Sequence, residues 1–364
     1  MEHDAEAPTA TETSGLLGTS TAALADLATL VRGWEDAHES RLRKDQYIIM
    51  RLDGHAFRTW TKGFAKPSDE RINLALLLTT HHLIEEFDAR TGYCHSDEIT
   101  LILPPAIPLM GDAAAADTGP ERKRDIARPP RLNLDADPSR YAHAYDGRVE
   151  KLCSLAASTA TARFNRCMNV YTDEELGDLA PHVRERVRSC AAVFDCRVFS
   201  VPTAEDAARA ILWRHRDCRR NAVMACAQAV FSSKRLHGVG AGKGVEMMGT
   251  ELGWEPLQTK LNLLTHEGAD VDVTKTMKTT VMAKVDVEAE AADHSQKAKQ
   301  RLNKNISLQF MYGTFVKKEQ YLLHTVDQKT GTPISVTRSR VTARSFEWTG
   351  TEEEMGWMAV RKYW

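Results

Sequence analysis

The hydrophobic positions in the first part of the chain follow two periods, one helical and one typical of strands. Helical spacing runs from Thr21 to about Lys44 and again from Asn73 to Phe87. The apolar run 47–52 (YIIMRL) predicts a buried strand, and 91–104 (TGYCHSDEITLILP) predicts two strands that reverse at Ser96-Asp97-Glu98. A strand, a helix and a hairpin form half of a ferredoxin-like βαββαβ arrangement. We therefore expect an α+β fold.

The same two periods continue further along the chain. Residues 147–168 predict a helix and 173–188 a further one, and the alternating segment 194–201 (FDCRVFSV) predicts a strand. A long helix follows over 204 to about 235, and the apolar, β-rich run 306–316 predicts another strand. These elements would complete the α+β core.

Three segments lack periodicity. Residues 1–20 have the composition of a disordered leader, 104–140 that of a long loop rich in proline, and 263–305 that of a solvated insertion with hardly any aromatics. We therefore expect one catalytic domain over 21–262, with 104–140 as an insertion in it. Residues 306–364 would complete that domain.

Composition narrows the class of protein. With 364 residues, 42% of them hydrophobic, the chain can bury a proper core, and a net charge of −2 requires any nucleic-acid contact to come from a local basic patch. The seven cysteines include no CxxC pair, which argues against a zinc ribbon or a disulfide scaffold. No apolar run reaches the length of a membrane helix. We expect a cytoplasmic protein of a reducing compartment, with no membrane partner and with the mitochondrion left open.

Two acidic residues are candidates for metal binding. Asp53 follows the strand 47–52 and Asp97 lies where the hairpin turns, so the two could meet across adjacent strands. Magnesium prefers hard oxygen ligands, and phosphoryl transfer gains from a metal pair at the attacking and leaving oxygens. Gly54 would let its carbonyl approach a metal or a triphosphate. The alternative is that Asp53-Gly54 and Ser96-Asp97 are simply turns.

Cations that could neutralise a triphosphate follow these acids. The segment 53–71 (DGHAFRTWTKGFAKPSDER) combines turn residues, an aromatic and several cations, and Arg148 and Lys151 lie one helical turn apart. Taken singly, each of these basic residues is more often a solvated surface charge.

The helix predicted over 204–235 carries a candidate RNA-facing surface. Cations and one aromatic recur on one helical face, followed by further polar residues: Arg209, Trp213, Arg216, Arg219, Arg220 and Asn221. The alternative is a solvated face with Trp213 packed inward.

A glycine-rich stretch after that helix, 237–244 (HGVGAGKG), is superficially similar to a phosphate-binding loop. His237 stands where a P-loop needs glycine, and Gly244 where it needs serine or threonine. We therefore expect a flexible turn.

A set of ordered motifs resembles one family. RLDGHAF, GFAKPSDER, GYCHSDEITL, GRVEKL, FDCRV, LWRHRDCRRN and FSSKRLHG occur in the order typical of the tRNA-histidine guanylyltransferase superfamily, from about residue 45 to 262 and again near Tyr312. The segment 218–221 (CRRN) replaces the HINNLYN-type stretch of the strict histidine-tRNA enzymes. The chain is therefore more similar to the guanylyltransferase-like, 3′-to-5′ RNA polymerase branch.

The resemblance implies roles for individual residues. Asp53, the Gly54 carbonyl and Asp97 would bind two magnesium ions, and Glu98 would be a supporting acid in catalysis. Nucleotide-binding positions would be Asp53, Gly54, His55, Ala56, Phe57, Arg58, Lys66, Ser96, Asp97, and the triphosphate-binding residues Arg148, Lys151 and Ser154. The usual DGRxFH segment is DGHAFR here, which exchanges the cations at positions 55 and 58 and could move phosphate contacts.

The resemblance also implies a fold and a reaction. The fold would resemble the palm of template-dependent polymerases, assembled as a homotetramer. The RNA 5′ end would be activated with ATP or GTP, and the 3′ hydroxyl of a nucleoside triphosphate would then attack it, on tRNA as the partner. Two alternatives are a nucleotide cyclase on the same palm fold and an RNA-binding relative with a degraded site.

Overall fold

The structure is a computed structural model. It describes residues 21–110, 131–253, 271–272, 307–326, 329, 331–347 and 359–364. The predicted leader 1–20, most of the loop 104–140 and nearly all of the insertion 263–305 lie outside the described residues. The chain divides into two units, 1–41 and 42–364.

The first unit contains the helix α1 (Thr21–His38). The helical spacing from Thr21 predicted it, although it ends before Lys44. Its apolar side chains, including Leu27, Leu30 and Trp34, are exposed.

The second unit is built on a seven-stranded sheet with the strand order β4-β1-β3-β2-β6-β7-β5. Its pairings are antiparallel. The strands are β1 (Tyr47–Gly54), β2 (Thr91–His95), β3 (Glu98–Leu103), β4 (Phe194–Val201), β5 (Val271–Asp272), β6 (Thr314–Val326) and β7 (Pro333–Arg344). With α3 after β1 and α4 after β3, the order β4-β1-β3-β2 is that of the ferredoxin-like arrangement. The predicted α+β class is confirmed.

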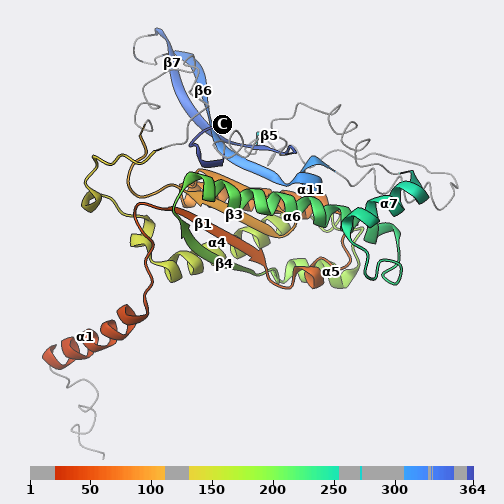
Figure 1. Ribbon diagram of the computed structural model, residues 1–364, viewed down its shortest axis with the longest axis horizontal. Helices are drawn as coiled ribbons and strands as arrows, with labels where there is room; N and C mark the ends of the chain where they lie inside the picture. The colour runs from red at the N-terminus through yellow and green to blue at the C-terminus, as the bar shows by residue number, and fades with distance from the viewer. Residues whose placement is uncertain are drawn as a thin grey trace, which may run out of the picture. The chain divides into compact units, whose positions relative to one another are not determined.

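Helices cover both faces of this sheet (Figure 1). The described helices of the second unit are α2 (Phe57–Trp60), α3 (Glu70–Glu86), α4 (Val149–Asn169), α5 (Pro181–Arg188), α6 (Ala204–Val230), α7 (Ala241–Leu252) and α11 (Leu308–Tyr312), with short 3-10 turns at Pro138–Arg140 and Ala144–Gly147. None of the described helices is long and apolar enough to cross a membrane.

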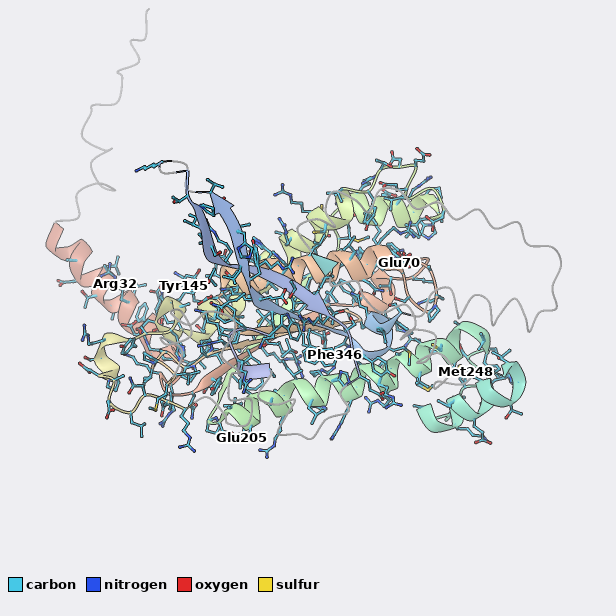
Figure 2. All side chains as sticks on the ribbon, turned by 90° about the horizontal axis from the view of Figure 1, so that it is seen from above. Arg32, Glu70, Tyr145, Glu205, Met248 and Phe346 are labelled. Atoms are coloured by element: carbon cyan, nitrogen blue, oxygen red, sulfur yellow. The ribbon has the colours of Figure 1, made fainter. Side chains whose placement is uncertain are left out.

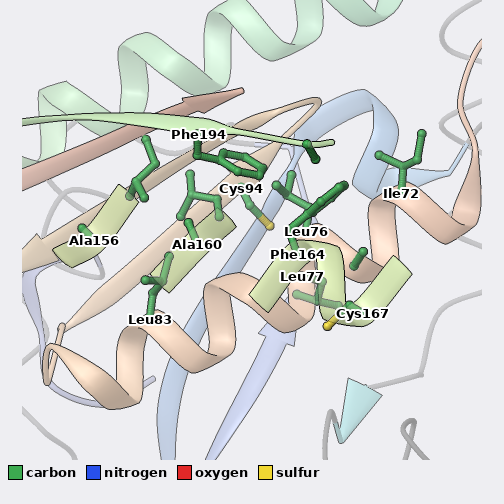
Figure 3. Packing of buried hydrophobic residues seen from close by; sticks show 14 of the residues in the cluster. Ile72, Leu76, Leu77, Leu83, Cys94, Ala156, Ala160, Phe164, Cys167 and Phe194 are labelled. Atoms are coloured by element: carbon green, nitrogen blue, oxygen red, sulfur yellow. The ribbon is translucent and has the colours of Figure 1, made fainter. Parts of the chain in front are cut away.

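Strand alternation divides the core in two. Ile48, Met50 and Leu52 of β1 point to the α3 and α4 side, whereas Tyr47 and Ile49 pack on the α6 side. On the first side, residues of α3 and α4 interlock with β4, as Figure 3 shows. The polar side chains of β1 that follow Ile49 therefore face the side that α6 covers.

A third apolar cluster joins the far end of α6 to α7 and α11. It includes Cys226, Met248 and Tyr312. Figure 2 labels Met248 on α7 and Glu205 near the opposite end of α6.

Three predicted elements differ from the structure. In the run 306–316, Leu308–Tyr312 is a helix and β6 begins only at Thr314, because the Ser307 side chain accepts a hydrogen bond from the Phe310 amide at 3.1 Å and caps the turn. The helix predicted over 173–188 begins at Pro181. The expected flexible turn 237–244 is wrong in its second half, since α7 begins at Ala241.

Candidate active site

Asp53 and Asp97 lie at the same end of the sheet. Asp53 is opposite Glu98 on β3 and Asp195 on β4. Asp97 lies in the β2–β3 turn, and its carbonyl accepts a hydrogen bond from the Gly54 amide at 3.0 Å. The antiparallel register of β1 and β3 therefore brings together two acids that are far apart in the sequence.

The surroundings of these two carboxylates disfavour their ionised form. Burial, and then the charges of Asp97, Glu98 and Asp195, raise the pKa of Asp53 above its ordinary value. Burial also raises the pKa of Asp97, although a 2.9 Å hydrogen bond from the Ser96 hydroxyl opposes this. Asp195 is a fourth acid at this end, beside Asp53, Asp97 and Glu98, and the sequence reasoning missed it.

The donor set fits a hard divalent cation. Carboxylate oxygens are the ligands that magnesium takes, usually one or two of them together with waters and substrate phosphates. No group of three or more His, Cys, Asp or Glu residues in the described part of the chain could hold a metal by itself. The pair Asp53 and Asp97 is therefore suited to an ion that also binds a nucleotide.

Glu98 points into a buried ion cluster. Its carboxylate accepts a hydrogen bond from Arg214, lies 3.1 Å from His95 Nε2 and lies 3.8 Å from Arg51 Nε. Burial opposes its ionisation, yet His95 and Arg214 hold the pKa of Glu98 below its ordinary value. Glu98 thus ties β3 to α6 next to the Asp97 turn, and the cations Arg51, His95 and Arg214 are site residues that the sequence reasoning missed.

His95 takes part in this cluster as a cation. Burial opposes its protonation, but hydrogen bonds with Cys218 and Glu98 raise the pKa of His95 to about 9. The positive charge beside the acidic turn lowers the cost of keeping Asp97 ionised.

Gly54 is required by packing. A Cβ at this position would lie 2.3 Å from Phe57 Cδ2. The Phe57 ring cannot move away, because it packs against Trp60, Phe164 and Phe194 at centroid distances of 5.2, 5.5 and 5.0 Å. The Phe57 side chain is therefore a core residue, and its expected place beside a nucleotide stays a prediction for its backbone.

The neighbours of Phe57 remain accessible. His55, Ala56 and Arg58 are exposed. The His55 amide donates to the Val193 carbonyl at 2.8 Å, and Ala56 has a φ of 54° where α2 begins. These three positions follow Asp53 and Gly54 in the sequence and lie outside the buried core.

Two cavities adjoin the acid pair. One, of about 320 Å³, is lined by Arg51, Asp53, His95, Ser96, Asp97, Glu98, Arg214 and Asn221. The other, of about 210 Å³, lies between the segment 61–69, α3, α6 and α11, and its lining includes Lys66, Asn73 and Gln309. His95, Ser96 and Asn221 line both cavities. Lys66 therefore lines one of these cavities and Asn221 lines both, while Asn221 is also exposed, so the expected nucleotide and RNA contacts of the two residues stay predictions.

The N-terminal part of α4, which carries the predicted triphosphate-binding residues, lies at the other end of the sheet. The Phe194 amide, at the Asp53 end, donates to Thr161 Oγ1 at 3.0 Å, whereas the Gly147 carbonyl accepts from the Leu42 amide at 2.9 Å before β1 begins. Since a helix rises 1.5 Å per residue, position 148 lies about 20 Å along α4 from Thr161. Arg148, Lys151 and Ser154 therefore do not meet Asp53 within one chain, contrary to expectation.

The outer face of α6 is exposed as predicted. Arg209, Arg216, Arg219 and Arg220 are accessible to solvent. Arg209 pairs with Asp206 at 2.9 Å, Arg219 pairs with Glu347 at 2.8 Å, and Arg220 pairs with Asp217. Trp213 is 57% exposed, so the alternative that it packs inward is wrong.

Part of the chain is similar to a known protein family. Residues 28–202 match the model of a family described as tRNAHis guanylyltransferase. This segment, just under half of the chain, is similar to the tRNAHis guanylyltransferase family. The matched segment contains Asp53, Asp97 and the α4 cations, and it ends before α6.

Individual relatives are distant. An uncharacterized protein of Acanthamoeba polyphaga mimivirus is 30% identical over 209 residues, which is 57% of this chain and 63% of the relative. The chain therefore spans less than two thirds of that relative's length.

Solved structures similar to the chain include two of a bacterial tRNA(His) guanylyltransferase-like protein. The complex with ATP is 24% identical with a TM-score of 0.48, covering 64% of this chain and 81% of that one. The complex with GTP is 26% identical with a TM-score of 0.41, covering 56% and 77%. The tRNA(His) guanylyltransferase of Saccharomyces cerevisiae is 18% identical with a TM-score of 0.42, covering 62% and 86%.

Proposed function

We propose that the chain is a magnesium-dependent nucleotidyltransferase that adds nucleotides in the 3′-to-5′ direction to the 5′ end of tRNA. The observation that carries the proposal is the pair Asp53 and Asp97, which two antiparallel strands bring together beside a cavity in a tRNAHis guanylyltransferase domain. The native reaction is guanylate addition to histidine tRNA or templated repair of a 5′ end.

The proposed reaction has two stages. A 5′-monophosphate of the RNA attacks the α-phosphorus of ATP, which releases pyrophosphate and leaves a 5′-adenylylated end. The 3′ hydroxyl of GTP then attacks the 5′ phosphorus of that end, loses its proton and displaces AMP. When bound, magnesium would stabilise the charge that develops on the attacking and leaving oxygens.

Different residues would bind the metal ions, support the Asp97 turn and hold the nucleotide. Asp53 and Asp97 would hold the ions, and the cluster of Glu98, His95 and Arg214 keeps the Asp97 turn in place. The second cavity, with Lys66 at its edge, would hold the nucleoside triphosphate next to Ser96. Amide side chains at Asn73 and Gln309 line that cavity and are suited to hydrogen bonding with a base.

The test is a reaction with purified protein, magnesium, ATP, GTP and a 5′-monophosphorylated tRNA that lacks its first nucleotide. We expect extension by the wild type and none by Asp97→Asn. Asp45→Asn is the matched control, because Asp45 is an acid just before the opposite end of β1 that pairs with Arg43 at 2.8 Å. Extension that Asp97→Asn leaves unchanged would refute the mechanism.

The same assay separates the finer alternatives. Extension of full-length histidine tRNA only would identify guanylate addition, whereas extension of truncated tRNAs according to the opposite base would identify repair. Binding of tRNA without any magnesium-dependent product would identify an RNA-binding relative with a degraded site, and a cyclic nucleotide product would identify a cyclase.

A further inference from the structure

The strand β4 forms an outer edge of the sheet (Figure 1). The Val193 carbonyl, just before β4, accepts a hydrogen bond from the His55 amide at 2.8 Å. Main-chain groups point to the two sides of a strand in turn, so the odd-numbered residues of β4 turn theirs toward β1. The even-numbered residues therefore turn their amides and carbonyls outward, away from the sheet.

The helix α4 leaves only part of this edge open. The Asn165 side chain donates to the Ala192 carbonyl at 2.7 Å and accepts from the Ala192 amide at 3.2 Å. Thr161 Oγ1 accepts from the Phe194 amide at 3.0 Å. The open part of the edge therefore begins at the Phe194 carbonyl and continues along β4.

Four exposed side chains form a row along this edge. Phe199 lies opposite Ile49, which packs on the α6 side, so alternation places four residues on that side: Val193, Asp195, Arg197 and Phe199, the β4 row. Val193 is 48% exposed and Phe199 is 42% exposed, and the two charged residues are exposed as well. Neither Asp195 nor Arg197 forms an ion pair with a residue that the structure describes.

The order of the β4 row makes it complementary to itself. Along the strand it is apolar, acid, cation, apolar at every second position. When two such rows run antiparallel with Cys196 opposite Cys196, each Asp195 lies opposite an Arg197, and each Val193 lies opposite a Phe199. Opposite charges and aromatic–β-branched pairs directly across neighbouring strands are stabilising. A row that only protected an edge from pairing would need charge but not this order.

We propose that two copies of the chain pair through the β4 edge, antiparallel and about a two-fold axis at Cys196. The two sheets then continue as one across the interface. Cys196 of each copy exchanges main-chain hydrogen bonds with Cys196 of the other, and each Val198 amide donates to a Phe194 carbonyl. The proposal does not depend on the proposed function, and it gives the location of an interface, which the expected tetramer leaves open.

Other registers fit the β4 row less well. An axis at Val198 would set Arg197 against Phe199 and would leave Asp195 without a cation. An axis at Phe194 would displace the hydrogen bonds that α4 makes with this edge. The charges therefore select the register, since the main chain alone would also allow the axis at Val198.

The pairing brings a cation to the acid end of the sheet. Asp195 lies directly opposite Asp53 in the β1–β4 ladder. Arg197 of the second copy, paired with Asp195, would therefore lie two strand spacings from Asp53, about 10 Å. Because the two β4 strands run in opposite directions, the Val201 end of the second copy's sheet, where its α4 begins, lies on the side of the Asp53 end of the first.

The test is the mass of the full chain in solution, measured by sedimentation velocity over a range of concentrations. Asp195→Arg and Arg197→Asp each set like charges opposite one another twice at the interface. We expect each substitution to raise the dissociation constant of this interface by roughly 5- to 500-fold and to halve the mass of the particle. An equimolar mixture of the two variants should reassemble, because each acid then meets a cation of the other chain.

The double variant Asp195→Arg/Arg197→Asp should also assemble, since it exchanges the two charges and keeps their order complementary. Arg209→Asp is the matched control, because it reverses an exposed arginine on α6 and not on β4, and it should leave the mass unchanged. Hydrogen exchange gives the register: the Cys196 and Val198 amides should exchange slowly in the wild type and fast in Asp195→Arg.

Three results would each overturn the proposal: a wild-type chain that stays monomeric, single reversals that leave the mass unchanged, and a failure of both the mixture and the double variant to assemble. None of these measurements uses RNA or a nucleotide. Their outcome is therefore separate from that of the extension assay.

Discussion

Replacing Gly54 by alanine tests whether packing or metal approach requires glycine next to the acid pair. The new Cβ would lie 2.3 Å from Phe57 Cδ2 and 2.6 Å from Cγ, well inside van der Waals contact. The ring is 3% exposed and packed among aromatics, so the overlap has to be absorbed by the core. Overpacking of this kind costs about 1–3 kcal/mol in the free energy of unfolding.

The measurement is urea unfolding of the wild type, Gly54→Ala, Phe57→Leu and the double variant. Leucine gives up part of the ring volume, so the double variant should be more stable than the sum of the two single losses, with a coupling of about 0.5–3 kcal/mol. Gly242→Ala is the control, because no atom lies within 4 Å of its Cβ position and it lies in α7. That substitution should stabilise the protein by up to about 1 kcal/mol.

The reasoning is refuted if Gly54→Ala unfolds at the wild-type urea concentration. Wild-type stability together with lost magnesium-dependent extension would show that the position serves the metal or the nucleotide. A destabilised variant that regains both stability and extension when Phe57→Leu is added would show that packing alone demands glycine.

Three further predictions concern charge and assembly. Arg214→Met leaves the buried Glu98 carboxylate without its α6 partner and should lower the free energy of unfolding by about 3–5 kcal/mol in urea, and a loss below 1 kcal/mol would contradict the buried ion pair. Burial lowers the pKa of His215 from 6.5 to about 4 in the folded protein. The neutral, buried form is therefore fully favoured above pH 6.5, and the free energy of unfolding falls by about 3 kcal/mol in all as the pH drops from 6.5 to 4. Urea unfolding at pH 7.5 and 5 should show about 2 kcal/mol of this loss in the wild type and not in His215→Gln, and equal losses would exclude His215 as its source. We expect the α4 cations to serve the acid pair of another protomer in the expected tetramer, so that Asp97→Asn and Lys151→Ala are each inactive alone. A mixture of the two variants should then restore extension. An inactive mixture would contradict sharing between protomers.

Local patterns in the sequence were sufficient for most of the elements. The alternation and helical spacing predicted β1, β2, β3, β4, α3 and α4 with small errors at the ends, because each of these elements buries a regular face. They failed at Leu308–Tyr312, where a serine cap and the close contact of Gly313 with Tyr93 decide the backbone of a short apolar run.

The sequence by itself also determined the acid pair, since Asp53 ends a strand and Asp97 lies in the turn of the hairpin that pairs with it. Tertiary structure decided what surrounds that pair. Only the packed core shows that Phe57 lies under Gly54, and only the docking of α6 on β3 places Arg214 against Glu98. The α4 cations lie far from the acids because α4 runs along the sheet from its opposite end, a direction that no local pattern records.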